Sequence, residues 1–408
     1  MSTDVLVVGG SVAAVRAAEA IARHAPDLAI TVLSDEEHPP YERPPLSKVG
    51  LRDDLDLAAL TYPSVADLRG RGVEFRLGTR ATALDVGGRR VEVVDGSGRA
   101  SEIEYGAVVV TTGCEPIVPP LFRDLPDVYS LRRFQDAAAL RHAVSDRTRS
   151  VAVIGAGFIG GEFAATLAKD GRAVTIVDLA EKPLGRFGDR VAADYAALHR
   201  DSGVGLQLGD GVVGFENTAE GRVLRLGSGA TVPADVVLLG IGVRPSTEWL
   251  ASSGVVLNNG IECDAHLRAA DRVYAAGDVV RWPNARFGST MRIEHWTNAA
   301  EQGRIAGINA ANSVTGADPV VCATVPYFWS DQHGTRIQFS GFLSGDEEIV
   351  ESPGQDGSLY VYRSGDVVAG VLAFERRAEF VKIRALLRRE TSWETVQSML
   401  PLASSPVA

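Results

Sequence analysis

The sequence contains little cysteine, and what it has is not arranged as in disulfide-rich or zinc-binding proteins. The three cysteines, Cys114, Cys263 and Cys322, lie far apart and form no C-x-x-C pair. Disulfide frameworks and zinc sites depend on an even or closely spaced set of cysteines. We therefore expect no metal site and no disulfide framework, as is usual in a reducing cytoplasm.

Long apolar runs and an excess of positive charge are missing as well. No run of about 18 apolar residues, the length of a membrane-spanning helix, occurs in the chain. The opening MSTDVLVVGG enters a strand pattern without a basic and apolar leader. The net charge of −11 disfavours nucleic acid and anionic membranes as partners, since both are bound by a cationic face. We expect a cytoplasmic protein of two or three domains that binds neither.

Glycine, by contrast, is abundant, and it gathers where strands turn into helices. DVLVV (4–8) predicts a buried strand, residues 12–24 an Ala-rich helix and LAITVLSDEE (28–37) a second strand. In the turn between them, Gly9 holds the first position of a dinucleotide-binding fingerprint, but Ser11 and Ala14 replace the second and third glycines. Asp35 and Glu36 end the second predicted strand, where a ribose hydroxyl is expected. A purely structural role for this unit stays open.

A second and cleaner copy of the same unit covers residues 150–178, SVAVIGAGFIGGEFAATLAKDGRAVTIVD. Gly155, Gly157 and Gly160 form an intact G-x-G-x-x-G between a predicted strand and helix, and Asp178 closes the next strand. The helix N-terminus supplies N–H groups and a positive dipole end to phosphates. An acid at Asp178 accepts bonds from ribose hydroxyls and repels a 2′-phosphate, which favours NADH over NADPH. Two such units suggest two dinucleotides.

Four further stretches carry residues that such sites use. VVVTTGCEP (108–116), VLLGIGVRPS (237–246) and VYAAGDVV (273–280) are strands that end in glycine-containing turns. HPPYERPPLSK (38–48) holds two Pro-Pro pairs and delivers Arg43 and Lys48. Because proline fixes φ and extends the residue before it, this stretch is a poor helix and a poor central strand. It predicts either a rigid surface loop or a device that holds two cations in place.

Together these stretches resemble the two-dinucleotide flavoproteins, and YERPPLSK resembles the flavin loop of their ferredoxin reductase branch. GFIGGE (157–162), RIEHWTNAAEQG (292–303) and YFWSDQHG (327–334) are similar to the same branch. The resemblance covers essentially the whole chain. It implies an α/β protein with two Rossmann-like domains, one for FAD and one for NAD inserted into it, and a C-terminal α+β interface domain. The expected domains are 1–113 with 239–320 for FAD, 114–238 for NAD and 321–408 for the interface.

The resemblance also implies roles for single residues. Lys48 is expected beside the isoalloxazine, with Glu162 facing the nicotinamide and pairing with Lys48 as the other catalytic residue. The residues expected to bind FAD are Gly9, Ser11, Ala13, Asp35, Arg43, Lys48, Ala81, Arg132, Asp278, Trp296 and Trp329. Those expected to bind NAD are Gly155, Gly157, Ile159, Gly160, Glu162, Asp178 and Gly242. Each tryptophan could instead be a core residue.

The missing cysteines now bear on the chemistry. Disulfide reductases of this superfamily carry a cysteine pair beside the flavin, and NADH oxidases carry one redox cysteine in the loop that reads RPPLSK here. Electrons are therefore expected to pass from NADH through FAD to an external [2Fe–2S] ferredoxin, which feeds a cytochrome P450 or a Rieske oxygenase. A flavin accepts a hydride and releases electrons singly. We expect Lys48→Ala to slow flavin reduction more than it weakens FAD binding.

Other functions remain open at this point. Rubredoxin reductases and monodehydroascorbate reductases share much of the flavin loop, and an NADH-sensing flavoprotein is a different class. We expect a monomer or weak dimer. Since ferredoxins are acidic like this chain, docking requires a local basic patch, for which Arg292, Arg304 and Arg336 are candidates.

Beyond residue 321, the sequence predicts a small α+β domain that ends in a short loose tail, PLASSPVA. YVYRSGDVVAGVLAF (360–374) predicts a hairpin that turns at residues 364–366. AEFVKIRALLRRE (378–390) predicts an amphipathic helix with Phe380, Ile383, Leu386 and Leu387 on one face.

Overall fold

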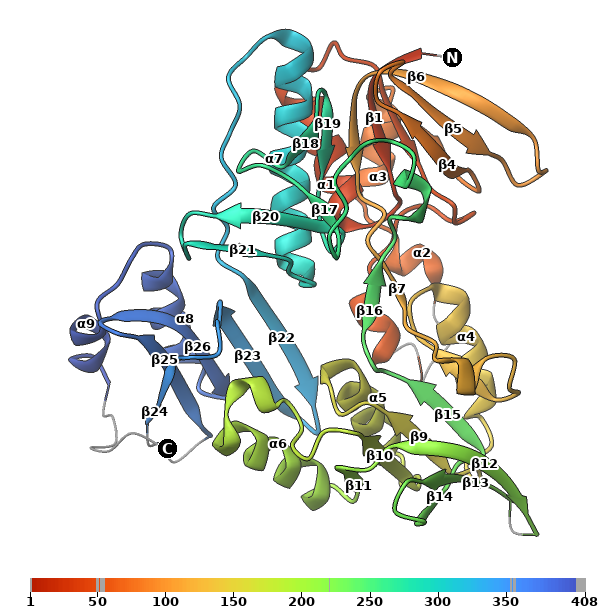
Figure 1. Ribbon diagram of the computed structural model, residues 1–408, viewed down its shortest axis with the longest axis vertical. Helices are drawn as coiled ribbons and strands as arrows, with labels where there is room; N and C mark the ends of the chain where they lie inside the picture. Colours follow the sequence, from red (N-terminus) through yellow and green to blue (C-terminus); the bar gives the residue numbers. More distant parts are fainter. Residues whose placement is uncertain are drawn as a thin grey trace. The chain divides into compact units, whose positions relative to one another are not determined.

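A computed structural model describes residues 2–48, 51, 56–219, 221–352, 354 and 357–400 (Figure 1). The chain forms two compact units. The first comprises residues 1–42, 57–115 and 244–328, and the second comprises 43–56, 116–243 and 329–408. Two of the points at which the chain passes from one unit to the other lie in short strands, β7 (Cys114–Pro116) and β16 (Val243–Pro245). The tail at 401–408, expected to be loose, lies outside the described residues.

The first unit is built on an eight-stranded sheet whose central strands are parallel. Its main order is β18-β19-β6-β1-β2-β3, and β5 joins β4 to the outer part of β6. A smaller sheet has the order β17-β20-β21. The elements of this unit are β1 (Ser2–Val8), α1 (Val12–His24), β2 (Ile30–Leu33), α2 (Leu57–Leu60), α3 (Ser64–Gly70), β3 (Glu74–Arg76), β4 (Arg80–Asp85), β5 (Arg90–Val94), β6 (Ala100–Val110), η5 (Glu248–Leu250), β17 (Ile261–Glu262), β18 (Arg268–Ala270), β19 (Val273–Ala275), β20 (Val280–Asn284), β21 (Ser289–Met291) and α7 (Trp296–Thr315).

The register of this sheet brings several strand ends to one edge. Val8 of β1 lies beside Leu33 of β2 and Val110 of β6, which in turn lies beside Ala275 of β19. In open parallel sheets, ligands bind beyond the carboxyl ends of the strands. The turn at Gly9, the acids after β2, the Thr-Thr-Gly after β6 and the Gly-Asp after β19 therefore meet at the edge where a dinucleotide is expected.

The second unit holds a five-stranded parallel sheet and a five-stranded antiparallel sheet. Their orders are β11-β10-β9-β15-β8 and β22-β23-β26-β25-β24, and a third sheet pairs β12-β13-β14. The elements are η1 (Pro44–Ser47), η3 (Pro120–Phe122), β8 (Val128–Ser130), α4 (Phe134–Ala143), β9 (Val151–Ile154), α5 (Phe158–Ala168), β10 (Val174–Asp178), η4 (Gly185–Phe187), α6 (Asp189–Asp201), β11 (Gly205–Leu208), β12 (Val212–Thr218), β13 (Gly221–Leu226), β14 (Thr231–Pro233), β15 (Val236–Leu239), β22 (Tyr327–Gln332), β23 (Thr335–Gly341), β24 (Glu348–Ser352), β25 (Leu359–Ser364), β26 (Val367–Phe374), α8 (Arg377–Leu387) and α9 (Trp393–Gln397).

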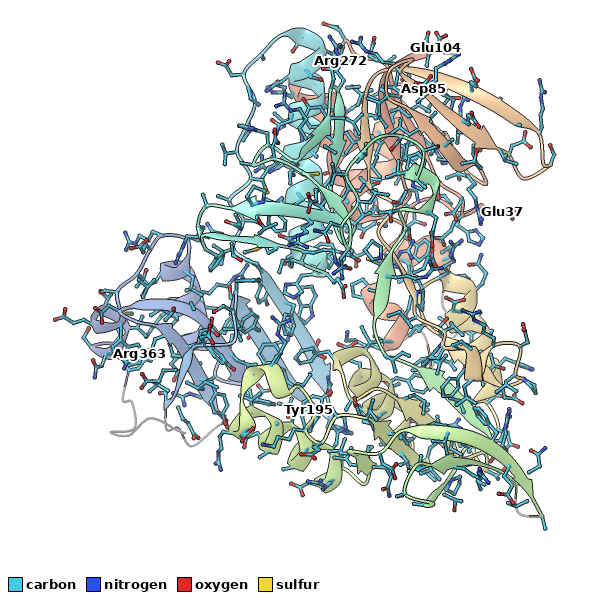
Figure 2. The ribbon with its side chains drawn as sticks, viewed as in Figure 1. Glu37, Asp85, Glu104, Tyr195, Arg272 and Arg363 are labelled. Carbon is cyan, nitrogen blue, oxygen red and sulfur yellow. The ribbon has the colours of Figure 1, made fainter. Side chains whose placement is uncertain are left out.

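The parallel sheet of the second unit is buried on both faces. Successive residues of β9 point to opposite sides, so Val151 and Val153 pack into one apolar cluster and Ala152 and Ile154 into another. A strand covered on both faces is expected to be continuously apolar, which is the pattern of VAVI. Figure 2 shows the side chains along the ribbon, including Tyr195, which is fully buried on α6.

The sequence-based boundaries are mostly confirmed. Helix α1 begins and ends where the Ala-rich pattern predicted, and β25 and β26 form the predicted hairpin with its turn at residues 364–366. The predicted amphipathic helix ends at Leu387, three residues before the expected Glu390, and its Phe380, Ile383 and Leu387 are buried. Within the described part of the chain, no helix has the length and apolarity to cross a membrane.

Candidate active site

The three glycines of the second fingerprint have three different surroundings. A Cβ on Gly155, whose φ is +110°, would lie 2.4 Å from the carbonyl oxygen of Gly240, so only glycine permits this turn. A Cβ on Gly160 would lie 2.3 Å from the oxygen of Gly155, so this glycine allows α5 to pack closely on β9. A Cβ on Gly157 would meet nothing within 4 Å. The protein's own packing therefore does not require glycine at residue 157, as expected where a pyrophosphate approaches the backbone.

Asp178, at the end of β10, lies at the same sheet edge. Its Oδ2 accepts a hydrogen bond from the N–H of Ala156 at 2.6 Å, and its Oδ1 accepts one from the N–H of Ala180 at 2.8 Å. The carboxylate thus fixes the fingerprint turn, and each oxygen keeps acceptor capacity for a ribose hydroxyl. Of the other NAD candidates, Ile159 is 51% exposed and Gly242 has a φ of +104° in an exposed turn.

The proline-rich stretch corrects one expectation, because part of it is helical. Residues 44–47 form the short 3₁₀ turn η1, in which the N–H of Lys48 donates to the carbonyl of Pro45 at 3.1 Å. Proline is well suited to the first helical positions because its missing N–H has no partner there. Arg43 precedes the turn and donates to the carbonyl oxygen of Arg132 at 3.0 Å, so these two FAD candidates lie together in the second unit.

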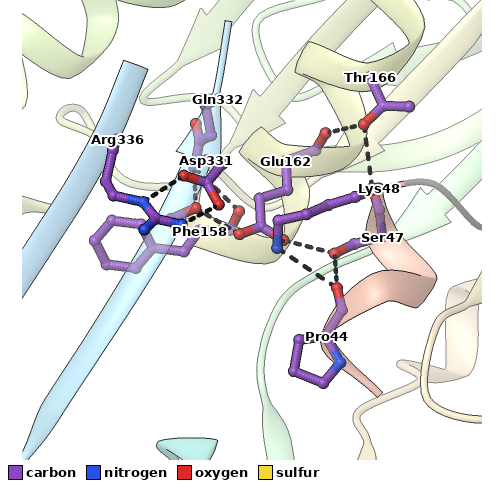
Figure 3. A network of polar contacts seen from close by, with 10 residues as sticks. Pro44, Ser47, Lys48, Phe158, Glu162, Thr166, Asp331, Gln332 and Arg336 are labelled. Atoms are coloured by element: carbon purple, nitrogen blue, oxygen red, sulfur yellow. Dashed lines mark hydrogen bonds and ion pairs between the residues drawn. The ribbon is translucent and has the colours of Figure 1, made fainter. Parts of the chain in front are cut away.

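Lys48 and Glu162 form the polar centre of the second unit (Figure 3). The Lys48 Nζ lies 2.9 Å from Oε2 of Glu162. Ser47 donates to the same oxygen at 2.6 Å, and Ser330 of β22 donates to Oε1 at 2.7 Å. The predicted Lys48–Glu162 pair is therefore present, and two hydroxyl groups that the sequence did not single out complete the carboxylate's bonds.

The surroundings of this pair are mostly closed to solvent. The side chain of Glu162 is 5% exposed and that of Lys48 is 25% exposed. A buried carboxylate is costly unless it is paired and hydrogen-bonded, and here it has one ammonium and two hydroxyl donors. Nearby, Arg336 holds Asp331 at 2.7 and 2.9 Å, and this hydrogen bond lowers the pKa of Asp331, with Lys48 a minor contributor. The pair as a whole is therefore neutral, and the Lys48 side chain is the part of it that reaches solvent.

Gly161 is a residue that the sequence reasoning missed, although it stands within the quoted GFIGGE. A Cβ there would lie 2.0 Å from the hydroxyl oxygen of Tyr195 and 2.5 Å from Oε1 of Gln332. Both of these side chains are buried, so neither end can move into solvent. The second glycine of the Gly-Gly pair therefore provides room for the polar side chains behind Glu162.

The glycine of the first fingerprint, in the other unit, is required for the same reason as Gly155, since a Cβ there would also lie 2.4 Å from a carbonyl oxygen at the end of the neighbouring strand, that of Thr111. Gly9 has a φ of +131°, and a Cβ there would lie 2.4 Å from Oγ1 of Thr111. Ser11 is the N-cap residue of α1 without a side-chain capping bond, and Ala13 is buried. A Cβ on Gly303 of α7 would lie 2.3 Å from the carbonyl oxygen of Ala13, so α7 packs directly on the start of α1.

The acids after β2 need a correction. The strand ends at Leu33, and Asp35 and Glu36 follow it rather than closing it. Asp35 is exposed, and Nη2 of Arg80 lies 3.7 Å from its Oδ2. Glu36 is buried and accepts a 2.6 Å bond from the hydroxyl of Tyr41, so its carboxylate serves the fold. Ala81 is half-buried on β4 of the same unit.

Beyond β19, the first unit contains a buried polar group that points to a ligand. Gln302 of α7 is fully buried, and its Oε1 accepts from the N–H of Gly277 at 2.9 Å. Its Nε2 has no hydrogen-bond partner within the described protein. A buried amide donor without a partner is costly, and a bound dinucleotide would supply an acceptor. Gln302 was missed as a candidate, although the quoted RIEHWTNAAEQG contains it.

The remaining FAD candidates are half-buried, as residues on a ligand site are expected to be. Asp278 follows Gly277, whose φ is +86°. Trp296 opens α7 and donates from Nε1 to the hydroxyl of Tyr62 at 3.2 Å. Trp329 lies on β22 in the second unit. Neither tryptophan is a core residue; the fully buried tryptophan is Trp282.

The three cysteines form no disulfide. Cys114 and Cys322 are buried, Cys263 is partly buried, and all three are free. Across the described ranges, no three His, Cys, Asp or Glu side chains gather as a metal site requires.

Two family models match the chain, pyridine nucleotide-disulphide oxidoreductase over residues 3–303 and reductase C-terminal over residues 327–401. The chain belongs to the pyridine nucleotide-disulphide oxidoreductase family. The rhodocoxin reductase of Rhodococcus erythropolis is 31% identical over 394 residues, which cover 95% of this chain and 90% of that protein. The ferredoxin–NAD(+) reductase component of the anthranilate 1,2-dioxygenase system of Burkholderia cepacia is 35% identical over 371 residues, which cover 90% of this chain and 89% of that protein.

The fold is shared with a solved structure along nearly its whole length. The ferredoxin reductase for the CYP199A2 system from Rhodopseudomonas palustris matches with a TM-score of 0.88 at 30% identity, covering 97% of each chain. The family resemblance and the α/β fold predicted from the motifs are thus confirmed. The protein is an oxidoreductase that uses FAD and NADH.

Proposed function

We propose that this protein is an NADH-dependent ferredoxin reductase, which takes a hydride from NADH on FAD and delivers single electrons to a [2Fe–2S] ferredoxin. The observation that carries the proposal is the Lys48–Glu162 pair. Lys48 stands in the loop RPPLSK, which has no cysteine, whereas relatives that exchange disulfides need a cysteine there. The names of the similar proteins agree with it. The ferredoxin would in turn serve a cytochrome P450 or a Rieske oxygenase, and the cytoplasm is the proposed location.

The residues present fit both dinucleotides. We propose that the N–H groups after Gly9 and at the start of α1 hold the pyrophosphate of FAD. Asp35 would bind the ribose of FAD, and the buried Nε2 of Gln302 would donate a hydrogen bond to the same dinucleotide. The remaining FAD contacts fall to Ser11, Ala13, Arg43, Lys48, Ala81, Arg132, Asp278, Trp296 and Trp329. NAD falls to Gly155, Gly157, Ile159, Gly160, Glu162, Asp178 and Gly242, with Gly157 leaving room for its phosphates. The division into FAD, NAD and interface domains, at 1–113 with 239–320, 114–238 and 321–408, also remains our proposal.

A bound flavin supplies the chemistry, since it accepts a hydride and releases electrons one at a time. The task of the protein is to orient the reactants and to stabilise the charge that develops. Lys48 is held by Glu162 and by the turn at residues 44–47, so its ammonium needs little reorganisation when negative charge appears beside it. Glu162 is itself buried and keeps that ammonium oriented.

For ferredoxin docking, the candidate arginines differ in their surroundings. Arg292 is 15% exposed and pairs with Glu294 at 2.7 Å, and Arg336 is held by Asp331. Arg304 is exposed on α7. We propose Arg304 as the first target, because its charge reversal would lower the association rate with an acidic partner in a salt-sensitive way.

The experiment that tests the function begins with the visible spectrum of the purified protein, which should be that of an oxidised flavin. NADH should bleach it, and cytochrome c reduction should depend on an added [2Fe–2S] ferredoxin. A colourless protein that cannot be reconstituted with FAD would refute the proposal. Turnover with rubredoxin or ascorbate radical but not with ferredoxin would favour the alternative reductases. A protein that binds NADH without turnover would be an NADH sensor.

A further inference from the structure

The hydrogen bonds of Glu162 continue away from Lys48 through a line of buried side chains of the second unit. Ser330, which donates to Glu162, accepts a bond from Nε2 of Gln332 at 2.9 Å. Oε1 of Gln332 lies 3.0 Å from Nε2 of His199, and Nδ1 of His199 lies 3.0 Å from Nε2 of His333. Ser330, Gln332 and His199 are 0–1% exposed, whereas His333 is half-buried. We call these four residues the Glu162 chain.

The direction of each bond in the Glu162 chain follows from donor and acceptor counts. The Glu162 carboxylate, paired with the Lys48 ammonium, can only accept, so the single hydroxyl proton of Ser330 points to it. Ser330 must therefore receive its next bond from the amide NH₂ of Gln332. The same NH₂ lies 3.3 Å from the carbonyl oxygen of Phe158, which is also only an acceptor. Two acceptors thus fix the Gln332 amide, and its oxygen faces His199.

The two histidines continue the same direction. Because the Gln332 oxygen only accepts, His199 carries its proton on Nε2. Burial lowers the pKa of His199 to about 4, with His333 as a smaller cause, so its ring is neutral near pH 7. A neutral ring has one N–H, so Nδ1 of His199 accepts, and Nε2 of His333 donates to it. Each hydrogen bond between successive members of the Glu162 chain is then donated in the direction of Glu162.

We propose that the Glu162 chain is a positioning device for the reaction, in which four aligned donors hold the Glu162 carboxylate oriented against Lys48. Aligned hydrogen bonds polarise one another, so the terminal Ser330 hydroxyl is a stronger donor than an isolated serine. The inference rests on the proposed role of Lys48 and Glu162 at the reacting rings. The ionisable groups that face Glu162 are Lys48, at 2.9 Å, and the Tyr195 phenol, whose pKa burial raises, so it stays protonated.

The direction of the chain is tested in the intact flavoprotein by NMR of ¹⁵N-labelled histidine. Long-range ¹⁵N–¹H correlations distinguish the two neutral tautomers and the charged ring. His199→Gln and His333→Gln assign the signals, and His142→Gln, in an exposed position on α4, is the matched control. Both rings should be neutral and protonated on Nε2 at pH 7. A His199 ring that is charged or protonated on Nδ1 would overturn the inference.

The positioning role is tested by the pH profile of flavin reduction by NADH in stopped flow. Ser330→Ala removes a bond to a charged acceptor and should slow reduction about tenfold. The pH profile should change with it, because the carboxylate has lost one of the donors that orient it. Ser330→Thr keeps the hydroxyl and should restore the profile, and Ser145→Ala, at an exposed site, should match the wild type.

The outcomes separate this inference from the proposed function. If Lys48→Met slows reduction but Ser330→Ala leaves both rate and profile unchanged, the Glu162 chain has no positioning role and the reductase proposal stands. If Lys48→Met also leaves reduction unchanged, the placing of Lys48 at the reaction is wrong, and the inference fails with it.

Discussion

The charge balance between Lys48 and Glu162 predicts that removing both charges harms the reaction less than removing the lysine alone. Lys48→Met keeps the aliphatic stem but leaves the Glu162 carboxylate buried without its cation. That negative charge opposes the transfer of a hydride and the negative charge that the transfer brings to the site. Adding Glu162→Gln to Lys48→Met, as a double variant, removes the opposing charge and keeps the size of the side chain.

The distance between the two charges sets the size of the effect. At 2.9 Å and an effective dielectric of about 20, the gross attraction is ~6 kcal/mol. Desolvation of both groups cancels much of it, and a net coupling of about 1.5–3 kcal/mol is typical of hydrogen bonds to charged groups. Lys48→Met should therefore slow reduction about 100-fold, as the loss of an electrostatic donor does. The double variant should recover about 10-fold of that loss.

The assay is the rate constant of flavin reduction by excess NADH in stopped flow, with FAD content measured on the same samples. Lys182→Met is the control, because Lys182 pairs with Asp189 at an exposed site of the same unit. FAD content should stay near that of the wild type in each variant. A double variant as slow as the product of the two single effects would show that the charges act independently, and the reasoning would be wrong.

Three other predictions follow from packing and burial. Gly157→Ala should weaken NADH binding with little change in melting temperature, because its Cβ meets nothing, whereas Gly160→Ala, 2.3 Å from a backbone oxygen, should lower the melting temperature. Burial lowers the pKa of His199 to about 4, so its contribution to stability is complete above about pH 6.5 and is lost as the pH falls through 4. The melting temperature of His199→Gln should therefore fall less steeply with decreasing pH than that of His142→Gln. Gly303→Ala should cost about 1–3 kcal/mol and lower the FAD content of the purified protein, and full retention of FAD would contradict the close packing of α7 on Ala13.

The sequence was sufficient wherever the determinant is local. The Ala-rich helix at 12–24, the intact fingerprint and the hairpin turn at 364–366 depend on residues a few positions apart, and all are present as predicted. Errors arose where a local rule met a competing contact. The strand before Asp35 ends at Leu33, and Glu36 is bound by Tyr41 within the fold. Prolines that argued against a helix instead begin a 3₁₀ turn.

The candidate site was predicted only in part, because its polar bonds join distant parts of the chain. Lys48 and Glu162 were paired through the family resemblance, and their contact is present. Ser330 and Gln332 stand in a quoted motif, yet nothing local indicates that they reach residues 162 and 199. Serine, glutamine and histidine are common on protein surfaces, so only their burial indicates that their hydrogen bonds matter. Burial of these residues is a property of the tertiary packing, which the local sequence does not show.

The position of Lys48 explains why the loop and the C-terminal sheet belong to one mechanism. A lysine side chain is flexible and loses much conformational freedom when it is fixed. The turn at residues 44–47 fixes only its backbone, and Glu162 fixes its ammonium. Glu162 in turn is held through Ser330 and Gln332 of β22. Orientation of the cation therefore depends on β22, so changes in this strand should alter hydride transfer even where they touch neither dinucleotide.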